Sequence, residues 1–522
     1  MTLKPIELVR NYHERTKHKL DGYARGPEFL DWDQQPDPFR RFAGAGVTEL
    51  PLLPSDATAD EPGYQLATVA ALLELSLGLS VWKQFGADRW ALRCNPSSGN
   101  LHPTEGYVIA TAIDGIENGV YHYAPREHAL EQRGIAKNSA TAPQLLIGLS
   151  SIMWRESWKY GERAFRYVQL DTGHALGAIR YAAEVMGLQV TLLDVSDDEI
   201  SHLLGIDRDV DFTGAEKEHP DLLLQIHINK VARPVVFPVI DAWNGSANPL
   251  GRSPHPQWEI IDKVAAATRC DSPMEMRRPR SVFPEPLPRE NRHSLTQLIR
   301  QRRSAQAFIS MQSTLSLNRF YRILDALLPR AQQAPLDVWR LPCLIHPVLF
   351  VHRVEELPPG LYAFPRRDEA REKLKAAMNQ EFNWEKPQSC PPHLPLYQLL
   401  QADAQEAART ISCHQEIASS SAFSLGMLAE FESGLSCGPC GYRRMYWEAG
   451  LLGQILYLEA EAADIRGTGI GCFFDDNFHQ LLGLEGTEFQ SLYHFTVGMP
   501  AIDTRLEDLP PYSHLSRAAS HD

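Results

Sequence analysis

The sequence predicts an α+β fold that occurs twice in the chain. One observation is an internal repeat: RYVQLDTG (166–173) in the first half matches RRMYWEAG (443–450) in the second half. The second is that candidate helices and strands follow one another without regular βαβ alternation, which favours α+β over a parallel α/β fold. Solenoid units are only about 20–50 residues long. The repeat therefore indicates a duplicated domain.

Shorter repeats extend the match along both halves. Leu203-Leu204-Gly205 recurs at Leu481-Leu482-Gly483, Gly119-Val-Tyr121 recurs at Gly360-Leu-Tyr362, and His102-Pro103 recurs at His346-Pro347. The distance along the sequence between the two copies of a motif is larger for the downstream motifs than for the upstream ones. It predicts an insertion of about 35 residues in the second copy, within 370–420, where loops accept added length at low cost.

The first domain is expected over 60–240, after an N-terminal arm at 1–59. Apolar residues at helical spacing predict a helix over Leu66–Leu79. β-Branched and aromatic residues predict strands over Tyr107–Ala112 and Leu222–His227.

A longer helix is predicted over Asp171–Met186, where apolar residues recur at intervals of three and four. Gly187 follows as a helix-stop signal.

A Pro-, Gly- and Asn-rich segment at 241–290 predicts a linker, with a candidate short helix over Trp258–Thr268. The second domain is expected over 291–505 and a tail over 506–522. Ala422–Phe431 is a candidate strand in the second domain.

Composition bounds the class of protein. The chain has 522 residues, of which 43% are hydrophobic, which is enough for two domains with real cores. A formal charge of −14 argues against general nucleic-acid binding, which needs clustered Lys and Arg. The N-terminus has no signal-peptide pattern and no apolar run approaches the roughly 20 residues that span a membrane. Eight cysteines then indicate reduced thiols. We expect a cytoplasmic protein that binds neither membranes nor nucleic acid.

Two polar motifs are candidates for ligand binding. The loop at 93–103, expected between a helix and a strand, contains Pro96, Ser97, Ser98, Gly99 and Asn100. Its hydroxyls, amide and glycine suit the polar edge of a planar heteroaromatic ligand, although a plain turn is the alternative.

The second motif is Arg302, Arg303 and Ser304. Guanidinium groups bind phosphate in a bidentate manner and serine can donate a further hydrogen bond, whereas the alternative is a solvated helix face.

A third motif, GTGIGCFFDD (467–476), predicts a Gly-rich turn that leads into a helix capped by Asp. Its glycines do not have the spacing of a dinucleotide-binding fingerprint, and no βαβ unit follows, so we exclude that reading.

These motifs together resemble the FMN-dependent nitroreductase superfamily. The resemblance rests on the Arg-Arg-Ser segment, the Pro-Ser-Ser-Gly-Asn loop and the Gly-Phe-Asp-Asp…Leu-Leu-Gly-Leu ending. The arm at 17–33 and the block WKYGER (158–163) to His174 resemble more narrowly the SagB-type dehydrogenases of that superfamily. The resemblance covers about residues 10–505 and implies two tandem nitroreductase-like domains.

The resemblance implies how FMN is bound. In the family, two subunits build each site: one supplies the Arg-Arg-Ser segment and the Gly-rich loop, the other the Pro-Ser-Ser loop. Here the first copy keeps only the Pro-Ser-Ser loop and has Asp194 where the repeat puts Gly471. The second copy keeps the other two motifs but has Arg340-Leu-Pro-Cys343 at the Pro-Ser-Ser position. The resemblance thus implies a monomeric internal pseudo-dimer with one FMN, in which Gly471, Cys472 and Phe473 approach the flavin.

Lys159 and Tyr160 are the catalytic candidates. In SagB-type dehydrogenases a Lys-Tyr pair at this position is assigned to proton removal, and desolvation beside a ligand can bring a lysine into the range of a general base. The alternative is a surface lysine next to a packed tyrosine.

Three other patterns suggest different chemistry. Cys437-Gly-Pro-Cys440 has the spacing of a redox-active pair, and with Cys413-His414 it could bind zinc, although adjacent ligands are geometrically awkward. Gly434-Leu-Ser-Cys-Gly438 matches a hydrolase nucleophile elbow but lacks the surrounding βα units. We expect no metal site.

Three functions compete. The first is an FMN oxidoreductase that transfers hydride from NAD(P)H to an electron-poor small molecule. The second is a SagB-type dehydrogenase that oxidises a substrate such as a peptide azoline, which Lys159-Tyr160 favours. The third is a non-enzymatic flavin-binding or scaffolding protein, which the loss of one site suggests.

Overall fold

The structure is a computed structural model that describes residues 3–54, 62–137, 142–228, 234–251, 258–271, 283–290 and 293–515. The chain divides into two compact units. Unit 1 comprises Met1–Gly26, Asp262–Thr268 and Arg277–Asp503, and unit 2 comprises Pro27–Ile261, Arg269–Met276 and Thr504–Asp522. Unit 2 thus contains the first copy of the repeat and unit 1 the second.

Unit 2 is built on an antiparallel sheet. Its elements are β1 (Phe42–Ala43), β2 (Gly46–Glu49), α2 (Leu66–Ser76), β3 (Leu79–Phe85), β4 (Asp88–Arg93), β5 (Thr104–Thr111), β6 (Gly119–Ala124), β7 (Ala129–Ala136), β8 (Gln144–Ser151), α3 (Met153–Tyr160), α4 (Ala164–Val185), β9 (Gln189–Leu192), α5 (Asp197–Leu204), β10 (His219–His227), β11 (Ile240–Trp243), β12 (Ser246–Ala247) and β19 (Glu507–Leu509). The strand order is β11-β7-β6-β5-β8-β10-β9, with β2 also paired to β7.

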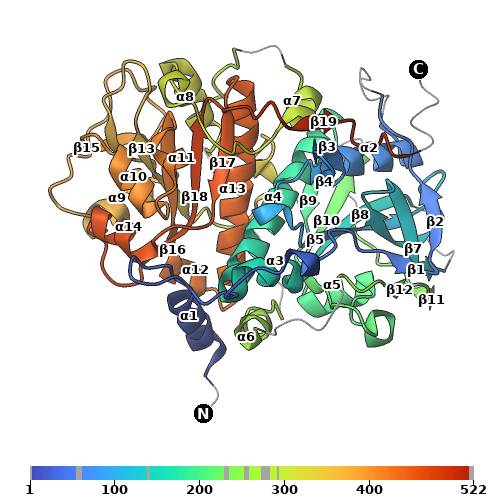
Figure 1. Ribbon diagram of the computed structural model, residues 1–522. Helices are drawn as coiled ribbons and strands as arrows, with labels where there is room; N and C mark the ends of the chain where they lie inside the picture. Colours follow the sequence, from blue (N-terminus) through green and yellow to red (C-terminus); the bar gives the residue numbers. More distant parts are fainter. Residues whose placement is uncertain are drawn as a thin grey trace. The chain divides into compact units, whose positions relative to one another are not determined.

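Both faces of this sheet are covered (Figure 1). The buried helix α4 contacts β5, β8 and β9 on one face and packs against α2. On the other face, Ile200 and Leu204 of α5 join Tyr107, Ile109 and Leu223 in one apolar core. Two covered faces explain why β5, β8 and β10 are buried along most of their length.

Unit 1 repeats this plan. Its elements are α1 (Pro5–Arg15), α7 (Leu295–Gln301), α8 (Leu317–Asp325), β13 (Ile345–Val351), β14 (Gly360–Ala363), α9 (Asp368–Ala377), β15 (Tyr397–Gln401), α10 (Gln405–Ile411), α11 (Glu416–Ser419), β16 (Phe423–Glu430), α12 (Phe431–Leu435), α13 (Gly441–Ala462), β17 (Arg466–Ile470), α14 (Asp475–Leu482) and β18 (Phe489–Gly498). The strand order is β15-β14-β13-β16-β18-β17. The division between the units passes through α6 (Glu259–Ala267).

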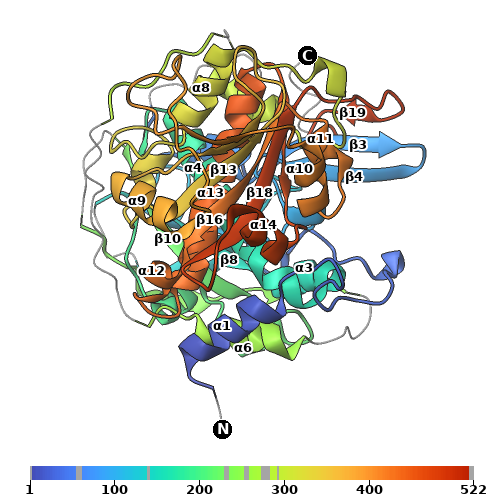
Figure 2. The ribbon, with the colours of Figure 1, turned by 90° about the vertical axis from the view of Figure 1, so that its left-hand side faces the viewer.

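In unit 1, α13 lies on one face of the sheet and contacts β13, β17 and β18. The helices α9, α10, α11 and α14 cover the other face, where Leu374, Ile411 and Phe478 pack on Val348 and Phe350 (Figure 2).

Each of the six strands of the unit 1 sheet has a counterpart in the unit 2 sheet, which has β2 and β11 in addition. Ala110 pairs with Gly119 in unit 2 as Val351 pairs with Gly360 in unit 1. On the other edge of the same strands, Ala110 pairs with Leu145 and Val351 pairs with Phe423. The predicted duplication is therefore present in the fold.

This register corrects one predicted repeat. Ala110 of β5 and Val351 of β13 are equivalent. Glu105 precedes Ala110 by the same number of residues as His346 precedes Val351, so Glu105 and His346 occupy equivalent positions. His102 therefore does not align with His346, and the His-Pro match is coincidental. The Gly-x-Tyr match at Gly119 and Gly360 is confirmed, because both glycines begin equivalent strands.

The helices follow the same repeat. α4 and α13 each contain 22 residues, and they carry the two copies of the motif at 166–173 and 443–450 at equivalent positions. α5 and α14 both end at a left-handed glycine, Gly205 and Gly483, because only glycine adopts positive φ there without strain.

The insertion in the second copy occurs at two places within the predicted region. Gly119 pairs with Ile135 of β7 as Gly360 pairs with Gln401 of β15, so β15 is the equivalent of β7. Extra chain precedes β15 and more follows it, relative to the first copy. One part of the insertion therefore contains α9, and the other contains α10 and α11.

Several elements have boundaries that differ from those predicted. The helix expected over Leu66–Leu79 ends at Ser76, because Leu79 begins the β3–β4 hairpin, and the helix expected from Asp171 begins at Ala164. Consequently the loop at 93–103 follows a strand, not a helix. Strands β11 and β12 lie in the expected linker, β19 lies in the expected tail, and residues 3–26 of the expected arm belong to unit 1. Linker residues 252–257 and 272–282 lie outside the described residues.

No helix in the described ranges is long and apolar enough to cross a membrane. All eight cysteines are free thiols.

Candidate functional site

The Pro-Ser-Ser-Gly-Asn loop of unit 2 connects β4 to β5 in a tight turn. Gly99 and Asn100 have φ values of 62° and 60°. The backbone N–H of His102 donates to Ser97 Oγ at 2.8 Å, which holds the turn closed. The Asn100 amide donates from Nδ2 to the Ala91 carbonyl at 3.0 Å, and its Oδ1 lies 2.8 Å from His102 Nε2. Both polar atoms of Asn100 therefore serve the loop itself.

Two buried carboxyl groups lie beneath this loop. Ser98 donates from its backbone N–H to both oxygens of Asp171 at 3.1 Å, and from Oγ to Oδ1 at 3.1 Å. Burial raises the pKa of Asp171 to about 7 despite these hydrogen bonds. Ser97 Oγ lies 3.5 Å from Glu156 Oε1, and burial, with repulsion from Asp171, raises the Glu156 pKa well above its usual range. The loop thus rests on carboxyl groups that resist ionisation.

Lys159 and Tyr160 lie directly against Gly99 of the same loop. A Cβ atom at Gly99 would be 2.6 Å from Tyr160 Oη and 3.2 Å from Lys159 Nζ, so only glycine fits there. Lys159 Nζ is 5.9 Å from the centre of the Trp32 ring, and Tyr160 packs edge-on against Tyr167 at 4.7 Å. The packed tyrosine matches the alternative interpretation, but Lys159 is half-buried and faces the loop.

In unit 1, Arg302 and Ser304 gather around Tyr457 of α13. The Tyr457 hydroxyl lies 2.9 Å from Ser304 Oγ and accepts a hydrogen bond from the Gly469 N–H at 3.0 Å. The Arg302 guanidinium is buried and lies 5.1 Å from the centre of the Tyr457 ring. One tyrosine therefore joins the Arg-Arg-Ser segment to the Gly-rich segment.

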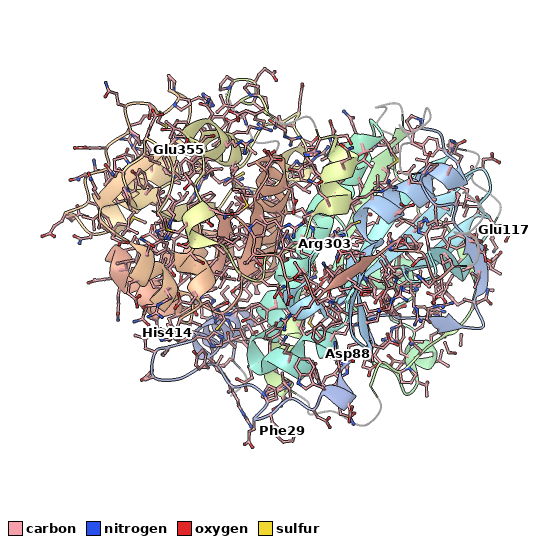
Figure 3. The ribbon with its side chains drawn as sticks, turned by 45° about the horizontal axis from the view of Figure 1, so that its top comes forward. Phe29, Asp88, Glu117, Arg303, Glu355 and His414 are labelled. Atoms are coloured by element: carbon pink, nitrogen blue, oxygen red, sulfur yellow. The ribbon has the colours of Figure 1, made fainter. Side chains whose placement is uncertain are left out.

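Arg303, which Figure 3 labels, has a different role from Arg302. Its Nη1 donates to the carbonyl oxygens of Arg300 and Arg302 at 2.8 and 2.7 Å, which caps the end of α7. Its backbone N–H donates to Glu461 at 3.2 Å, and burial raises the Glu461 pKa. Arg303 thus fixes the segment that carries Arg302.

The Gly-rich segment begins as a strand, where a turn was predicted. Residues Arg466–Ile470 form β17 and pair with β18. A Cβ at Gly467 would lie 2.5 Å from the Phe495 ring, and one at Gly469 would lie 1.8 Å from Tyr493 Oη. The glycines therefore make room for aromatic rings of the neighbouring strand.

Gly471, Cys472 and Phe473 connect β17 to α14. The Phe473 ring stacks on His494 at 4.2 Å with an angle of 15° between the ring planes, and the Cys472 carbonyl accepts a hydrogen bond from Gln415 at 3.2 Å. Helix α14 has Phe474 at its N-cap, not the predicted Asp.

The other sequence patterns have structural explanations. Cys437 is exposed, and Cys440 is buried in the connection between α12 and α13. The nucleophile-elbow pattern at Gly434–Gly438 begins within the short helix α12 and does not follow a strand, which excludes an elbow. Among the described residues, no group of three or more His, Cys, Asp and Glu side chains could hold a metal ion.

Similarity to known proteins identifies the family. A protein of Methanocaldococcus jannaschii that is named as a nitroreductase is 30% identical over 152 residues, which cover 27% of this chain and 72% of that protein. The chain belongs to the nitroreductase family. It is therefore related to a superfamily of oxidoreductases.

Two further comparisons extend this result. The trifolitoxin-processing protein TfxB of Rhizobium leguminosarum bv. trifolii is 36% identical over 110 residues, 18% of this chain and 30% of that protein. A crystal structure of a nitroreductase-family protein from Anabaena variabilis has a TM-score of 0.72 and 23% identity, and the match covers 95% of this chain and 99% of that one. The nitroreductase fold thus extends over almost the whole chain. No family model matches the sequence.

Sequence reasoning missed three residues near these motifs. Tyr457 gave no signal, because a tyrosine within a buried helix reads as core. In the sequence, Asp171 stands out only because it belongs to the repeat. In the structure, Asp171 accepts a hydrogen bond from the Ser98 N–H, and Glu448, its equivalent in the second copy, accepts one from the Leu344 N–H at 2.8 Å. Glu156 lies one helical turn before Tyr160, a spacing that could have indicated a shared face.

Proposed function

We propose that this nitroreductase-family chain is an FMN-dependent oxidoreductase that transfers hydride between NAD(P)H and an electron-poor small molecule. We further propose that each chain binds one FMN, for which each unit supplies the residues that it has kept. Bound FMN would supply the hydride chemistry, and the protein would supply binding and orientation.

The observation that carries the cofactor assignment is the cluster around Tyr457. A buried guanidinium from Arg302 and the hydroxyl of Ser304 are donors suited to a phosphate group, and the Tyr457 side chain joins both to the Gly-rich segment. In this proposal Arg302 and Ser304 hold the FMN phosphate, and Arg303 keeps the segment in place.

Unit 2 would supply contacts to the flavin ring. Pro96, Ser97, Ser98, Gly99 and Asn100 form a preorganised turn whose donors are fixed by Asp171 and His102. From unit 1, the backbone at Gly471, Cys472 and Phe473 would lie near the flavin and stabilise developing charge without reorganisation. The cluster around Tyr457 has no counterpart in unit 2, where the Arg-Arg-Ser motif is missing. We therefore do not expect a second complete FMN site.

The test is the amount of FMN in the purified full-length protein. FMN is released by denaturation and measured against protein concentration, and the expected value is about one per chain. Two per chain would contradict the single-site proposal. Absence of flavin, also after incubation with FMN, would contradict the cofactor assignment and favour a scaffolding protein.

A second candidate function is that of a SagB-type dehydrogenase that oxidises a peptide substrate such as an azoline. Two observations favour it: the contact of Lys159 and Tyr160 with Gly99, and the similarity to a trifolitoxin-processing protein. In this reaction Lys159 Nζ would accept a proton from the substrate and Tyr160 Oη would orient it.

Anaerobic mixing with NAD(P)H separates the two candidates. Rapid bleaching of the flavin absorbance supports the first function, and bleaching only by an azoline-containing peptide supports the second. If the second is correct, Lys159→Met should abolish reduction by the peptide while FMN content stays the same.

A further inference from the structure

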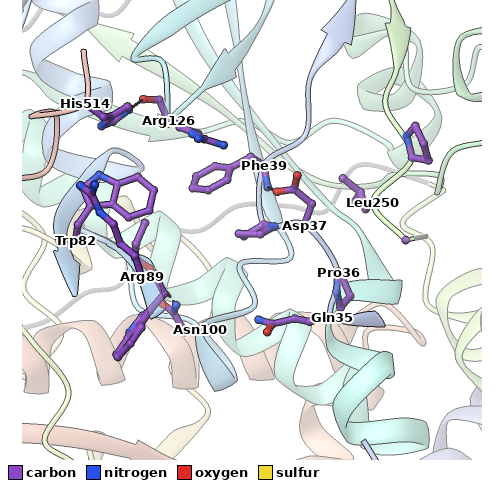
Figure 4. A pocket seen from close by; sticks show the side chains of 15 residues that line it. Gln35, Pro36, Asp37, Phe39, Trp82, Arg89, Asn100, Arg126, Leu250 and His514 are labelled. Carbon is purple, nitrogen blue, oxygen red and sulfur yellow. Dashed lines mark hydrogen bonds between the residues drawn. The ribbon is translucent and has the colours of Figure 1, made fainter. Parts of the chain in front are cut away.

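Unit 2 contains a pocket of ≈ 690 Å³ beside the β3–β4 hairpin (Figure 4). This volume is in the range of small-molecule sites, about 300–1,000 Å³. Its walls come from the segment before β1, from the hairpin, from the turn after β6 and from the chain after β19. Its aromatic and charged lining residues are Asp37, Phe39, Trp82, Arg89, Trp90, Arg126 and His514.

The floor of the pocket is aromatic. The rings of Phe39 and Trp82 lie 6.5 Å apart, and His514 packs edge-on against Trp82 at 5.4 Å. Trp82 Nε1 donates to the Pro511 carbonyl at 2.8 Å, and His514 Nε2 lies 2.8 Å from the Arg126 carbonyl oxygen. These contacts fix the rings, of which only 8% of Trp82 and 9% of Phe39 are exposed, so they offer a ligand a narrow apolar edge that is already in place.

Two exposed arginines lie above these rings. The Arg89 guanidinium is 4.6 Å from the centre of the Trp82 ring, and that of Arg126 is 5.7 Å from the centre of the Phe39 ring. Stacking on an aromatic face leaves the N–H donors along the guanidinium edge available to an anion.

The charge of the pocket is positive although that of the chain is −14. Within the described residues, neither Arg89 nor Arg126 forms an ion pair with a carboxylate. The one carboxylate in the wall, Asp37, accepts a hydrogen bond from the Phe39 N–H at 2.9 Å and stabilises its own turn. Two arginines without carboxylate partners in an acidic protein indicate a site for an anion.

We infer that this pocket binds a small ligand with a planar aromatic ring and an attached anionic group. The ligand ring lies against the exposed edges of Trp82 and Phe39, and Arg89 and Arg126 bind the anion. An aromatic carboxylate and the phosphate-bearing adenosine part of a nucleotide share this chemistry.

Asn100 connects the pocket to the candidate site. It lines the pocket, and its neighbour Gly99 contacts Lys159 and Tyr160. The pocket therefore adjoins the loop that we propose for flavin binding. Assigning the ligand as a reaction partner of the flavin rests on the proposed function, but binding of the ligand does not.

The test is titration calorimetry on the full-length protein with three probes: 4-nitrobenzoate, uncharged nitrobenzene and 2′,5′-ADP. At least one of the two anions should bind with a stoichiometry of one, and nitrobenzene should bind at least about tenfold more weakly than 4-nitrobenzoate if the carboxylate is the ligand type. Binding of 2′,5′-ADP alone would identify the nucleotide as the source of the anion. FMN content is measured on the same samples, so that a failure of the cofactor proposal is seen separately.

Arg89→Gln and Arg126→Gln should each weaken anion binding about three- to tenfold, because the contacts are charged but near solvent. Arg126→Lys should restore part of the affinity, since it keeps the charge but loses the planar edge. The matched control is Arg505→Gln: this exposed arginine lies 5.6 Å from the Phe85 ring in the same unit but does not line the pocket. The affinity of the Arg505→Gln variant for the anion should equal that of the unchanged protein.

Two results would overturn the inference. One is that neither anion binds to protein that retains its thermal transition. The other is that binding survives both glutamine substitutions combined, or is equally strong for nitrobenzene.

Discussion

At the scale of single residues, the neighbouring arginines Arg302 and Arg303 have different contacts and different roles. Arg302 is buried beside Tyr457 and Ser304, whereas the side chain of Arg303 caps α7 through backbone carbonyls. The sequence presents two adjacent arginines, and only the direction that the backbone takes after α7 separates them. A buried guanidinium beside a serine hydroxyl is well suited to bind an anion, and this sets Arg302 apart.

Arg302→Ala should therefore reduce FMN retention strongly. Loss of one partner of a desolvated charge contact costs about 2–5 kcal/mol. The measurement is the FMN dissociation constant by fluorescence of released flavin. Arg340→Ala, in the segment of the second copy that precedes β13 and has no Pro-Ser-Ser motif, is the control and should have little effect. Equal loss in both variants would show that the phosphate lies elsewhere, and Arg302→Lys separates loss of charge from loss of packing.

Asp171 should make the stability of unit 2 depend on pH. Its pKa is raised from 3.8 to about 7 by burial, so the folded state holds a proton that the unfolded state releases. The free energy of unfolding should then fall as pH rises from about 4 to 7, on the order of 3 kcal/mol, and stay level above 7. Denaturant unfolding at several pH values measures this. Asp171→Asn mimics the protonated acid and should flatten the profile; an unchanged slope in this variant would contradict the assignment.

At the scale of elements, the duplication explains which glycines are needed. Gly119 begins β6 and Gly360 begins β14, at equivalent positions of the two copies. A Cβ there would lie 2.2 Å from the Gly134 carbonyl oxygen and 2.0 Å from that of Leu400. In both sheets the register shifts near this glycine, after Val120 and after Leu361. The two copies therefore share a β-bulge that brings the neighbouring backbone close.

Gly119→Ala and Gly360→Ala should each destabilise the protein by about 1–3 kcal/mol, because the new methyl group meets backbone that cannot rotate away. The control is Gly22→Ala, where a Cβ meets nothing within 4 Å. Thermal unfolding compares the three variants. Similar melting temperatures for all of them would mean that the strands relax freely and that the bulge is not constrained.

How much the sequence predicts also differs between elements. The strands at Leu222–His227 and Ala422–Phe431 were predicted within a few residues, because buried apolar runs leave few alternatives. The sequence does not predict the β3–β4 hairpin, since Leu66–Leu79, which includes the first residue of β3, has the apolar spacing of one helix. The sequence predicts a turn for the Gly-rich segment because glycines are common in turns. The glycines are needed instead to make room for Tyr493 and Phe495, which lie on the neighbouring strand and are distant in sequence. The sequence also gives no sign of the role of Tyr457, because Ser304, which it contacts, is distant in sequence.

At the scale of the whole molecule, two copies of one fold carry different buried charges. In unit 2, His122 lies 2.9 Å from both Glu105 and Glu131, and these carboxylates raise its pKa to about 9 although burial alone would lower it. In unit 1, burial lowers the pKa of His346 to about 4, despite a contact of 3.1 Å with Glu430. The aligned positions are Glu105 and His346, so the two copies kept the strand but carry a carboxylate in one and a neutral imidazole in the other.

Acid should therefore destabilise unit 1 more than unit 2. His346 takes up a proton when unit 1 unfolds below pH 6.5 but not while it is folded above pH 4, which costs unit 1 about 2 kcal/mol at pH 5. The His122 contribution has the opposite sign: it is fully present below pH 6.5 and is lost only as pH rises through about 9. Hydrogen exchange by mass spectrometry, corrected for intrinsic rates, should show protection falling between pH 7 and 5 in peptides of β13 and β16 but not in those of β5 and β8. His346→Gln removes the titrating group and should abolish the difference in slope, whereas a slope retained in that variant would trace the acid response to other groups.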